Sequence, residues 1–158
     1  MIMGHVLVEE LDFTSSDLKE YNRNGVLEYL SQYMYQKGVV KPSFFEAIIS
    51  RERAFPTGLD LPKGGVAIPH TDPEHVIHDD IVVMRLKNPV EFNHMVLPNK
   101  TVETRIIIMI AVKQQEKQTH VLSSLMELIQ NEANMQTMLN EDKEDILGLL
   151  KEYKLMNI

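Results

Sequence analysis

The sequence predicts an α/β fold, a single domain in which a mixed β-sheet is flanked by helices on both sides (an α+β sandwich). Helical periodicity dominates before residue 54, short β-prone apolar runs lie between residues 65 and 112, and helical periodicity returns after residue 120. Helices on either side of a central group of strands pack as layers on one sheet. No repeat or linker divides the 158 residues. A chain of this length can bury roughly 70% of its unfolded surface, so we expect one domain over residues 1–158.

The first third of the chain predicts a short strand and two helices. The strand covers residues 5–8. A helix follows from Asn24, a capping-type residue, to Gly38, with apolar residues at helical spacing: Val26, Leu27, Leu30, Tyr33 and Met34. Pro42 suits the start of a second helix, whose buried side holds Phe44, Phe45, Ile48 and Ile49. Arg-Glu-Arg at residues 51–53 ends it, with cations where the helix dipole favours them.

The middle of the chain predicts the sheet. Residues 54–64 are rich in turn-forming residues and are predicted to form a loop. The strands are expected at residues 65–69, 80–86 and 104–112, with a short edge strand at 89–92 and a loop at 93–103. The remainder is predicted to be helical, with two apolar faces: Val121, Leu122, Leu125, Met126 and Ile129, then Ile146, Leu147, Leu150 and Tyr153.

Composition and charge exclude several classes of function. The chain is 44% hydrophobic and 25% charged, as in ordinary globular proteins. A net charge of −7 argues against a nucleic-acid binder, which needs a basic face, and is compatible with a basic protein partner. The absence of cysteine excludes disulfides, thiolate metal sites and cysteine nucleophiles.

The sequence also predicts a cytoplasmic protein with no direct insertion into the membrane. The amino terminus has no basic leader, and Glu9 and Glu10 interrupt it before a signal-like apolar stretch is complete. The longest strongly apolar run, residues 106–112, is only seven residues long and cannot span a bilayer.

The run Gly-Val-Ala-Ile-Pro-His at residues 65–70 is the most informative part of the chain. Val66 and Ile68 suit a buried strand, and Pro69, which has no N–H, ends regular sheet pairing. We therefore expect His70 at the edge of the sheet, where an imidazole can exchange protons, metals or phosphoryl groups near neutral pH.

The other histidines have simpler interpretations. His5, His78 and His94 are interpreted as ordinary surface or core residues. His70, His75 and His78 share one loop, but Pro73 disfavours the continuous helix that a zinc site of the H-x-x-E-H type requires, and the spacing is one residue too long. We expect neither a metal nor a cofactor. No Ser or Cys elbow and no Gly-rich phosphate loop supports a catalytic triad or a nucleotide site.

Several segments, taken in order, resemble one family. Arg-Glu at residues 51–52, Pro-Thr-Gly-Leu at 56–59 and Gly-Val-Ala-Ile-Pro-His at 65–70 resemble the phosphorylation-site region of enzyme IIA (EIIA, type 2) of the bacterial sugar phosphotransferase system, fructose/mannitol type. The similarity covers nearly the whole chain. Gly-Val-Val at 38–40 and Pro-Val-Glu-Phe-Asn at 89–93 most resemble its galactitol-specific members.

The resemblance implies a phosphohistidine relay. The phosphocarrier HPr would donate a phosphoryl group to His70, on Nε2, and His70 would pass it to a cysteine of the cognate enzyme IIB. The sugar, of the galactitol type, would be phosphorylated during uptake through the membrane enzyme IIC. The implied fold, a mixed sheet flanked by helices, agrees with the order of elements.

The resemblance also implies further site residues. Arg51 matches the arginine of the family's Arg-Glu pair and would contact the phosphoryl oxygens, with Arg53 the weaker candidate. His120 falls where several relatives carry a second active-site histidine, and His75 is a lesser candidate. Thr71 departs from the small residue usual after the Pro-His pair, and the gap between Arg51 and His70 is longer than in mannitol-type relatives.

Two other functions stay open at this stage. The same phosphorylatable module can act as a regulator that binds other proteins without feeding a transporter. The cluster of histidines leaves a metal-dependent hydrolase as the third possibility. Transfer of phosphate from HPr separates the hydrolase from the other two, and relay to enzyme IIB separates transport from regulation.

Overall fold

The computed structural model describes residues 3–11, 18 and 20–156. Five strands form one mixed sheet in the order β1-β4-β5-β3-β2. Their bounds are Met3–Leu11 (β1), Gly58–Leu61 (β2), Gly64–Ala67 (β3), Asp80–Asn93 (β4) and Thr101–Ala111 (β5). β1 is parallel to β4 and β3 is parallel to β5, whereas β4 with β5 and β2 with β3 are antiparallel.

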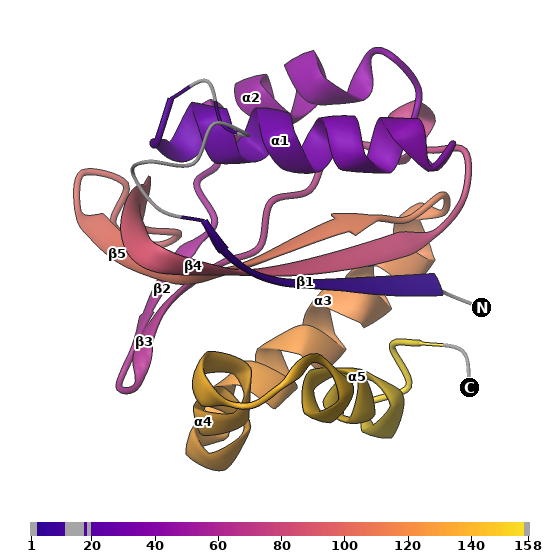
Figure 1. Ribbon diagram of the computed structural model, residues 1–158. Coiled ribbons are helices and arrows are strands. Elements are labelled where there is room, and N and C mark those ends of the chain that lie inside the picture. Colours follow the sequence, from indigo (N-terminus) through magenta and orange to yellow (C-terminus); the bar gives the residue numbers. More distant parts are fainter. Residues whose placement is uncertain (1–2, 12–17, 19, 157–158) are drawn as a thin grey trace.

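Helices cover both faces of this sheet (Figure 1). On one face lie α1 (Arg23–Gln36) and α2 (Phe44–Ala54), and on the other lie α3 (Gln115–Gln130), α4 (Glu132–Asn140) and α5 (Lys143–Glu152). A short 3₁₀ helix, η1 (Pro73–His75), follows β3. The predicted fold class, a mixed sheet between two helical layers, is confirmed. No helix among the described residues is long and apolar enough to cross a membrane.

The long apolar run of β5 is explained by burial on both faces. Side chains alternate along a strand, so Ile107 and Met109 pack with the α1–α2 layer while Ile106 and Ile108 pack with the α3–α5 layer. A strand between two helical layers has no polar face to show in its sequence. The two clusters of buried side chains therefore meet only through the sheet, and the end of β3 lies at the boundary between them.

The ends of α1 correct one prediction and confirm another. The cap is Asn22 and not Asn24, because the Asn22 side chain accepts a hydrogen bond from the backbone N–H of Gly25 at 2.9 Å. Both residues are capping types, and only the tertiary fold selects the first turn. Gly38 does end the helix: its φ of +75° is a left-handed conformation that glycine adopts without strain.

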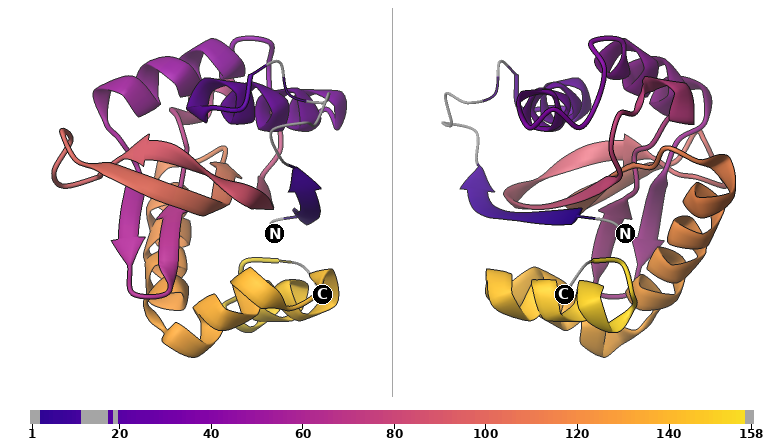
Figure 2. Two further views of the ribbon diagram at one scale, coloured as in Figure 1. Left: turned by 60° about the vertical axis from the view of Figure 1, so that its left-hand side comes forward. Right: turned by 90° about the vertical axis from the view of Figure 1, so that its right-hand side faces the viewer.

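Strand β2 lies within the segment predicted to be a loop. Its register pairs Leu59 with Val66 and Gly58 with Ala67, so the strand depends on its partner rather than on its own composition. The strand was not predicted because residues 54–64 are rich in turn-forming residues. Glycine is required at Gly65, where a Cβ would collide with the Glu103 carbonyl oxygen of β5. Figure 2 shows the β2–β3 hairpin leaving the edge of the sheet and running alongside α3.

Three further boundaries differ from the prediction. Residues 89–92 continue β4 instead of forming a separate edge strand, and β5 begins at Thr101, inside the predicted loop. The register shifts between Arg85 and Val90, and this irregularity accommodates Pro89, which cannot donate to the ladder. The predicted helical remainder also divides into three helices, since Asn131 caps α4 separately.

Candidate functional site

His70 lies just beyond the carboxyl end of β3, as the sequence predicts. The ladder ends at Ala67, two residues earlier than the predicted strand 65–69, and the Pro69 carbonyl accepts a hydrogen bond from the backbone N–H of Ile110 at 3.1 Å. This bond ties the chain to β5 after regular pairing has stopped. We refer to residues 68–71 as the His70 segment. The His70 side chain is partly buried there, at the boundary between the two helical layers.

The hydrogen bond of the imidazole identifies its tautomer. Nδ1 of His70 lies 2.8 Å from the carbonyl oxygen of Ile68. A carbonyl only accepts, so Nδ1 carries the proton and the neutral ring keeps a lone pair on Nε2. Burial lowers the pKa of His70 below its ordinary value of 6.5, and the nearby charge of Arg51 also lowers it. The hydrogen bond to Ile68 and the charge of Asp72 raise the pKa, but by less. The lowered pKa favours the neutral ring at pH 7, with the free lone pair on Nε2.

Arg51 brings positive charge to the same end of the sheet. It lies in the last turn of α2, with Nη1 3.6 Å from Oδ1 of Asp72 and Cζ 4.9 Å from the centre of the Phe55 ring. Its Nε is buried and has no hydrogen-bond partner among the described residues. A guanidinium with a donor to spare, 38% exposed and close enough to influence the charge of His70, suits an anionic group.

A buried acidic residue supports the His70 segment from the α2 side. Glu52, 2% exposed, accepts hydrogen bonds from Thr57 N at 2.7 Å and Thr57 Oγ1 at 2.8 Å. Thr57 Oγ1 in turn accepts from the backbone N–H of Ile68 at 3.1 Å. Burial raises the pKa of Glu52 above its ordinary 4.5, while the two bonds from Thr57 and the charge of Arg23 act in the opposite direction.

A buried amide supports the segment from the α3 side. Gln118, 4% exposed, donates from Nε2 to the carbonyl oxygen of Thr71 at 2.9 Å. Thr71 is itself buried, so the residue that departs from the usual small side chain is packed inside the protein. Gln115 donates to Oε1 of Gln118 at 3.2 Å and so orients the amide.

The predicted site residue on α3, His120, lies on a different face from Gln118. His120 is exposed. It follows Gln118 by two positions, which is roughly 200° around a helix. The structure therefore brings Arg51, Glu52, Thr57 and Gln118 to the His70 segment and shows no corresponding contact for His120, whose role stays a prediction.

Two of the other histidines, His75 and His94, form hydrogen bonds of their own. Nδ1 of His75 lies 2.8 Å from Oγ of Ser43, and Nε2 lies 3.7 Å from Glu74. His94 Nδ1 accepts the backbone N–H groups of Val96 and Leu97 in the β4–β5 turn. His78 is exposed, and the side chain of His5 lies outside the described part of the structure. Within the described residues, no group of three or more His, Asp or Glu could hold a metal ion.

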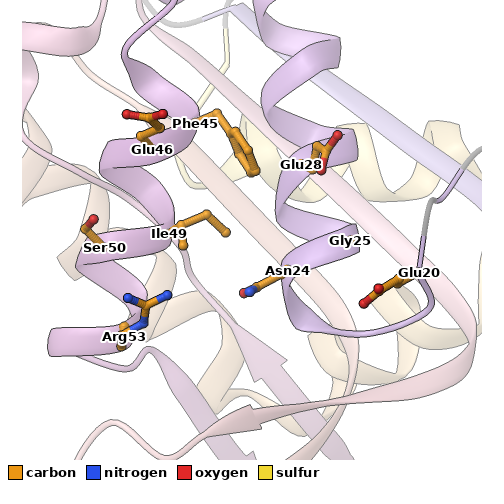
Figure 3. Close-up of a pocket in the computed structure, with 9 residues that line it drawn as sticks. All are labelled: Glu20, Asn24, Gly25, Glu28, Phe45, Glu46, Ile49, Ser50 and Arg53. Atoms are coloured by element: carbon orange, nitrogen blue, oxygen red, sulfur yellow. The ribbon is translucent and has the colours of Figure 1, made fainter.

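The second arginine of α2 faces a separate groove. This groove, of about 500 Å³, lies between α1 and α2, and the apolar side chains of Phe45 and Ile49 line it from α2 (Figure 3). Arg53 lines it from α2, opposite Asn24 of α1. Arg51 and Arg53 are two positions apart and thus project from different sides of α2. The geometry favours Arg51 over Arg53 as a neighbour of His70.

Three supporting residues, Glu52, Thr57 and Gln118, were not predicted from the sequence. Glu52 and Thr57 lie within the segments that carry the resemblance, but a charged residue near a helix end is ordinarily exposed. Gln118 lies in a polar stretch with no apolar signal. The sequence could have indicated Glu52 and Gln118 only as polar residues on the buried sides of their helices. Recognising those sides requires the helix boundaries, which the sequence alone does not provide.

Comparison with known proteins identifies one family. The model for the phosphoenolpyruvate-dependent sugar phosphotransferase system, EIIA 2, matches residues 9–153. The galactitol-specific EIIA component of the Escherichia coli phosphotransferase system (strain K12) is 30% identical over 143 residues, which cover 90% of this chain and 95% of that relative. The mannitol-specific EIICBA component of Pasteurella multocida is 28% identical over 150 residues, but these are only 23% of its length.

Solved structures share the fold. The crystal structure of IIA mannitol from Escherichia coli aligns with a TM-score of 0.65 at 20% identity, covering 94% of each chain. A complex of enzyme IIA of the mannitol system with phosphorylated enzyme IIB, also from Escherichia coli, aligns with a TM-score of 0.67 at 18% identity, covering 96% of this chain and 94% of the other. At these identities the likeness shows the fold alone.

Proposed function

Because the chain belongs to the EIIA 2 family of the phosphoenolpyruvate-dependent sugar phosphotransferase system, we propose that it accepts a phosphoryl group from phosphorylated HPr on His70 and passes it to a cognate enzyme IIB. Family membership, predicted from the order of the motifs, is confirmed by the family model and by the galactitol-specific relative.

The observation that carries the proposal is the hydrogen bond from His70 Nδ1 to the carbonyl of Ile68. It leaves Nε2 as the basic nitrogen of a ring whose lowered pKa keeps it neutral. A neutral imidazole in a defined orientation is a competent nucleophile at pH 7.

The transfer needs no proton to move. The Nε2 lone pair forms a bond to phosphorus as the bond between phosphorus and the donor atom of HPr breaks. Nδ1 keeps its proton and its hydrogen bond to the Ile68 carbonyl. The product carries a phosphoryl group on Nε2 and a proton on Nδ1, so the ring is formally a phosphoimidazolium, whose positive charge is offset by the negative phosphoryl oxygens and by the Ile68 carbonyl. In the second step the thiolate of an enzyme IIB cysteine forms a bond to phosphorus, the Nε2–P bond breaks, and the ring returns to its starting tautomer.

Arg51 supplies what phosphoryl transfer asks of a protein beyond alignment. The transition state carries negative charge on the equatorial oxygens, which a fixed guanidinium stabilises. Its 38% exposed side chain and its modest 3.6 Å contact between Nη1 and Asp72 leave terminal N–H donors for those oxygens. His120 is proposed as a second hydrogen-bond donor to the phosphoryl group.

The partners follow from the relatives. The galactitol-specific EIIA component makes a galactitol-type sugar the first candidate, and the mannitol IIA–IIB complex supports an enzyme IIB as acceptor. The proposed relay operates in the cytoplasm and serves the membrane enzyme IIC indirectly. No cofactor is part of the proposal.

Labelling with phosphorylated HPr tests the first step. We expect one acid-labile, base-stable phosphate per chain, located on His70 by mass spectrometry, and no label on His70→Ala. Label on another side chain, or its retention in His70→Ala, would refute the assignment.

Relay tests the second step. The labelled protein is mixed with galactitol enzyme IIB, and loss of label from His70 with gain on the IIB cysteine is expected. Stable phosphohistidine in the presence of that and related enzymes IIB would instead favour a regulatory module that acts through protein binding.

A further inference from the structure

The backbone of the His70 segment is held on the α2 side by one continuous set of buried hydrogen bonds. Glu52 accepts from both donors of Thr57, and Thr57 accepts from the N–H of Ile68. The carbonyl of the same Ile68 accepts from His70 Nδ1. Glu52, Thr57 and Ile68 are all buried, so no solvent can replace a lost partner easily.

The direction of each bond in this set is forced. Ile68 N–H can only donate, so Thr57 Oγ1 must accept it and turn its own proton elsewhere. The proton points at Oε1 of Glu52, 2.8 Å away, and Oε2 accepts Thr57 N–H at 2.7 Å. Two donors on one carboxylate thus orient the hydroxyl, and the hydroxyl holds Ile68 where the β3 ladder has ended.

The held residue decides the orientation of the catalytic ring. Ile68 N–H and Ile68 C=O belong to different peptide groups, so the effect passes through the backbone torsions of Ile68 and not through resonance. The next residue, Pro69, has no backbone N–H that could hold the segment through a further hydrogen bond. Within the described part of the chain, the Thr57 hydroxyl is therefore the one acceptor for the N–H groups of residues 68–69, and by holding Ile68 it orients the carbonyl that accepts the hydrogen bond from His70 Nδ1.

We propose that Glu52 and Thr57 are positioning residues for His70: by holding Ile68 they keep the imidazole in the Nδ1–H tautomer and leave Nε2 free to accept the phosphoryl group. This inference rests on the proposed function for the transfer step, but its structural half, the tautomer of His70, can be measured in the unphosphorylated protein.

The test compares Thr57→Val with wild type in two measurements. Valine keeps the branched shape and removes the hydroxyl. We expect the ¹⁵N chemical shifts of His70 to show a mixture of tautomers in place of the Nδ1–H form. We also expect the rate of labelling by phosphorylated HPr to fall about tenfold, the scale set by one unsatisfied buried donor. Thr57→Ser, which keeps the hydroxyl, should restore both.

Thr104→Val is the matched control. Thr104 is also fully buried, and its hydroxyl donates to a backbone carbonyl, that of Val102 at 3.1 Å, in β5. The same chemical change there should leave the His70 tautomer and the labelling rate as in wild type. If Thr57→Val does not fold, Glu52→Gln decides. The two Thr57 donors use different carboxylate oxygens, and the amide replaces one of these by an NH₂ group, which only donates. A smaller shift in the same two measurements is expected.

Unchanged ¹⁵N shifts and labelling rates in a folded Thr57→Val, or in Glu52→Gln, would overturn the positioning role and leave the phosphoryl-carrier proposal intact. Absence of label on wild-type His70 would overturn the carrier proposal, while the tautomer measurement would still decide whether Glu52 and Thr57 position the ring.

Discussion

The two helical layers support the His70 segment with different chemistry. A buried carboxylate and a guanidinium lie on the α2 side, and a neutral amide lies on the α3 side. Glu52 acts through Thr57 on the N–H of Ile68, and Gln118 acts directly on the carbonyl of Thr71. Both hold the backbone on either side of His70. Two charges influence the pKa of the ring: Arg51 on α2 lowers it, and Asp72, in the loop that follows His70, raises it.

This difference assigns two tasks to two layers of the fold. We expect the α2 layer to influence both the charge near the ring, through Arg51, and its tautomer, through Glu52 and Thr57. We expect the α3 layer to contribute position alone, because the neutral amide of Gln118 holds Thr71 without adding charge to the site. The predictions below test that division, from the largest expected effect to the smallest.

Arg51→Ala should slow labelling of His70 by about 100-fold, the scale of losing one charged donor to a transition state. Arg53→Ala is the matched control on the same helix, since Arg53 lines the α1–α2 groove, and its rate should equal that of wild type. Initial rates at saturating phosphorylated HPr measure both. Equal rates for the two variants would show that the α2 side supplies no specific charge.

Gln118→Leu should slow labelling by up to about tenfold, because one neutral hydrogen bond to Thr71 is lost. The ¹⁵N shifts of His70 should stay those of the Nδ1–H tautomer, in contrast to Thr57→Val. Thr119→Ala, on the exposed side of the same turn, provides the control. A change of tautomer in Gln118→Leu would contradict the division between the two layers.

His120→Ala should slow labelling by only about two- to threefold, the size expected for an exposed charged or polar contact. Such a decrease would give the α3 side a chemical part as well as a positional one. A rate identical to wild type would remove His120 from the site and leave Gln118 as the contribution of α3.

The pH dependence should be slight near neutrality. Because burial lowers the pKa of His70 below 6.5, protonation removes the Nε2 lone pair only as the pH falls through that lowered value. The labelling rate should thus vary little between pH 8 and 6.5 and fall below it. Removing Arg51 should raise the pKa of His70, since the guanidinium lowers it. A ¹⁵N titration with a midpoint at or above 6.5 in wild type would contradict this expectation.

Much of the fold was predictable because its signals are local. Apolar runs and helical spacing predicted the layers, and Pro69 after Val66 and Ile68 predicted that His70 follows the end of a strand. Strand β2 was missed because its four residues are strand-like only in their pairing with β3. The cap of α1 was displaced by two residues because two asparagines offered the same local chemistry.

By itself, the sequence determined the family, the architecture of a sheet between two helical layers and the histidine proposed to carry the reaction, since these depend on the order and spacing of neighbouring residues. Only the tertiary structure decided which residues surround that histidine. Glu52, Thr57 and Ile68 form one set of hydrogen bonds, and Gln118 reaches Thr71 across 47 positions of chain. Such contacts depend on where helices end and which way they face, and burial makes those few polar groups obligatory partners.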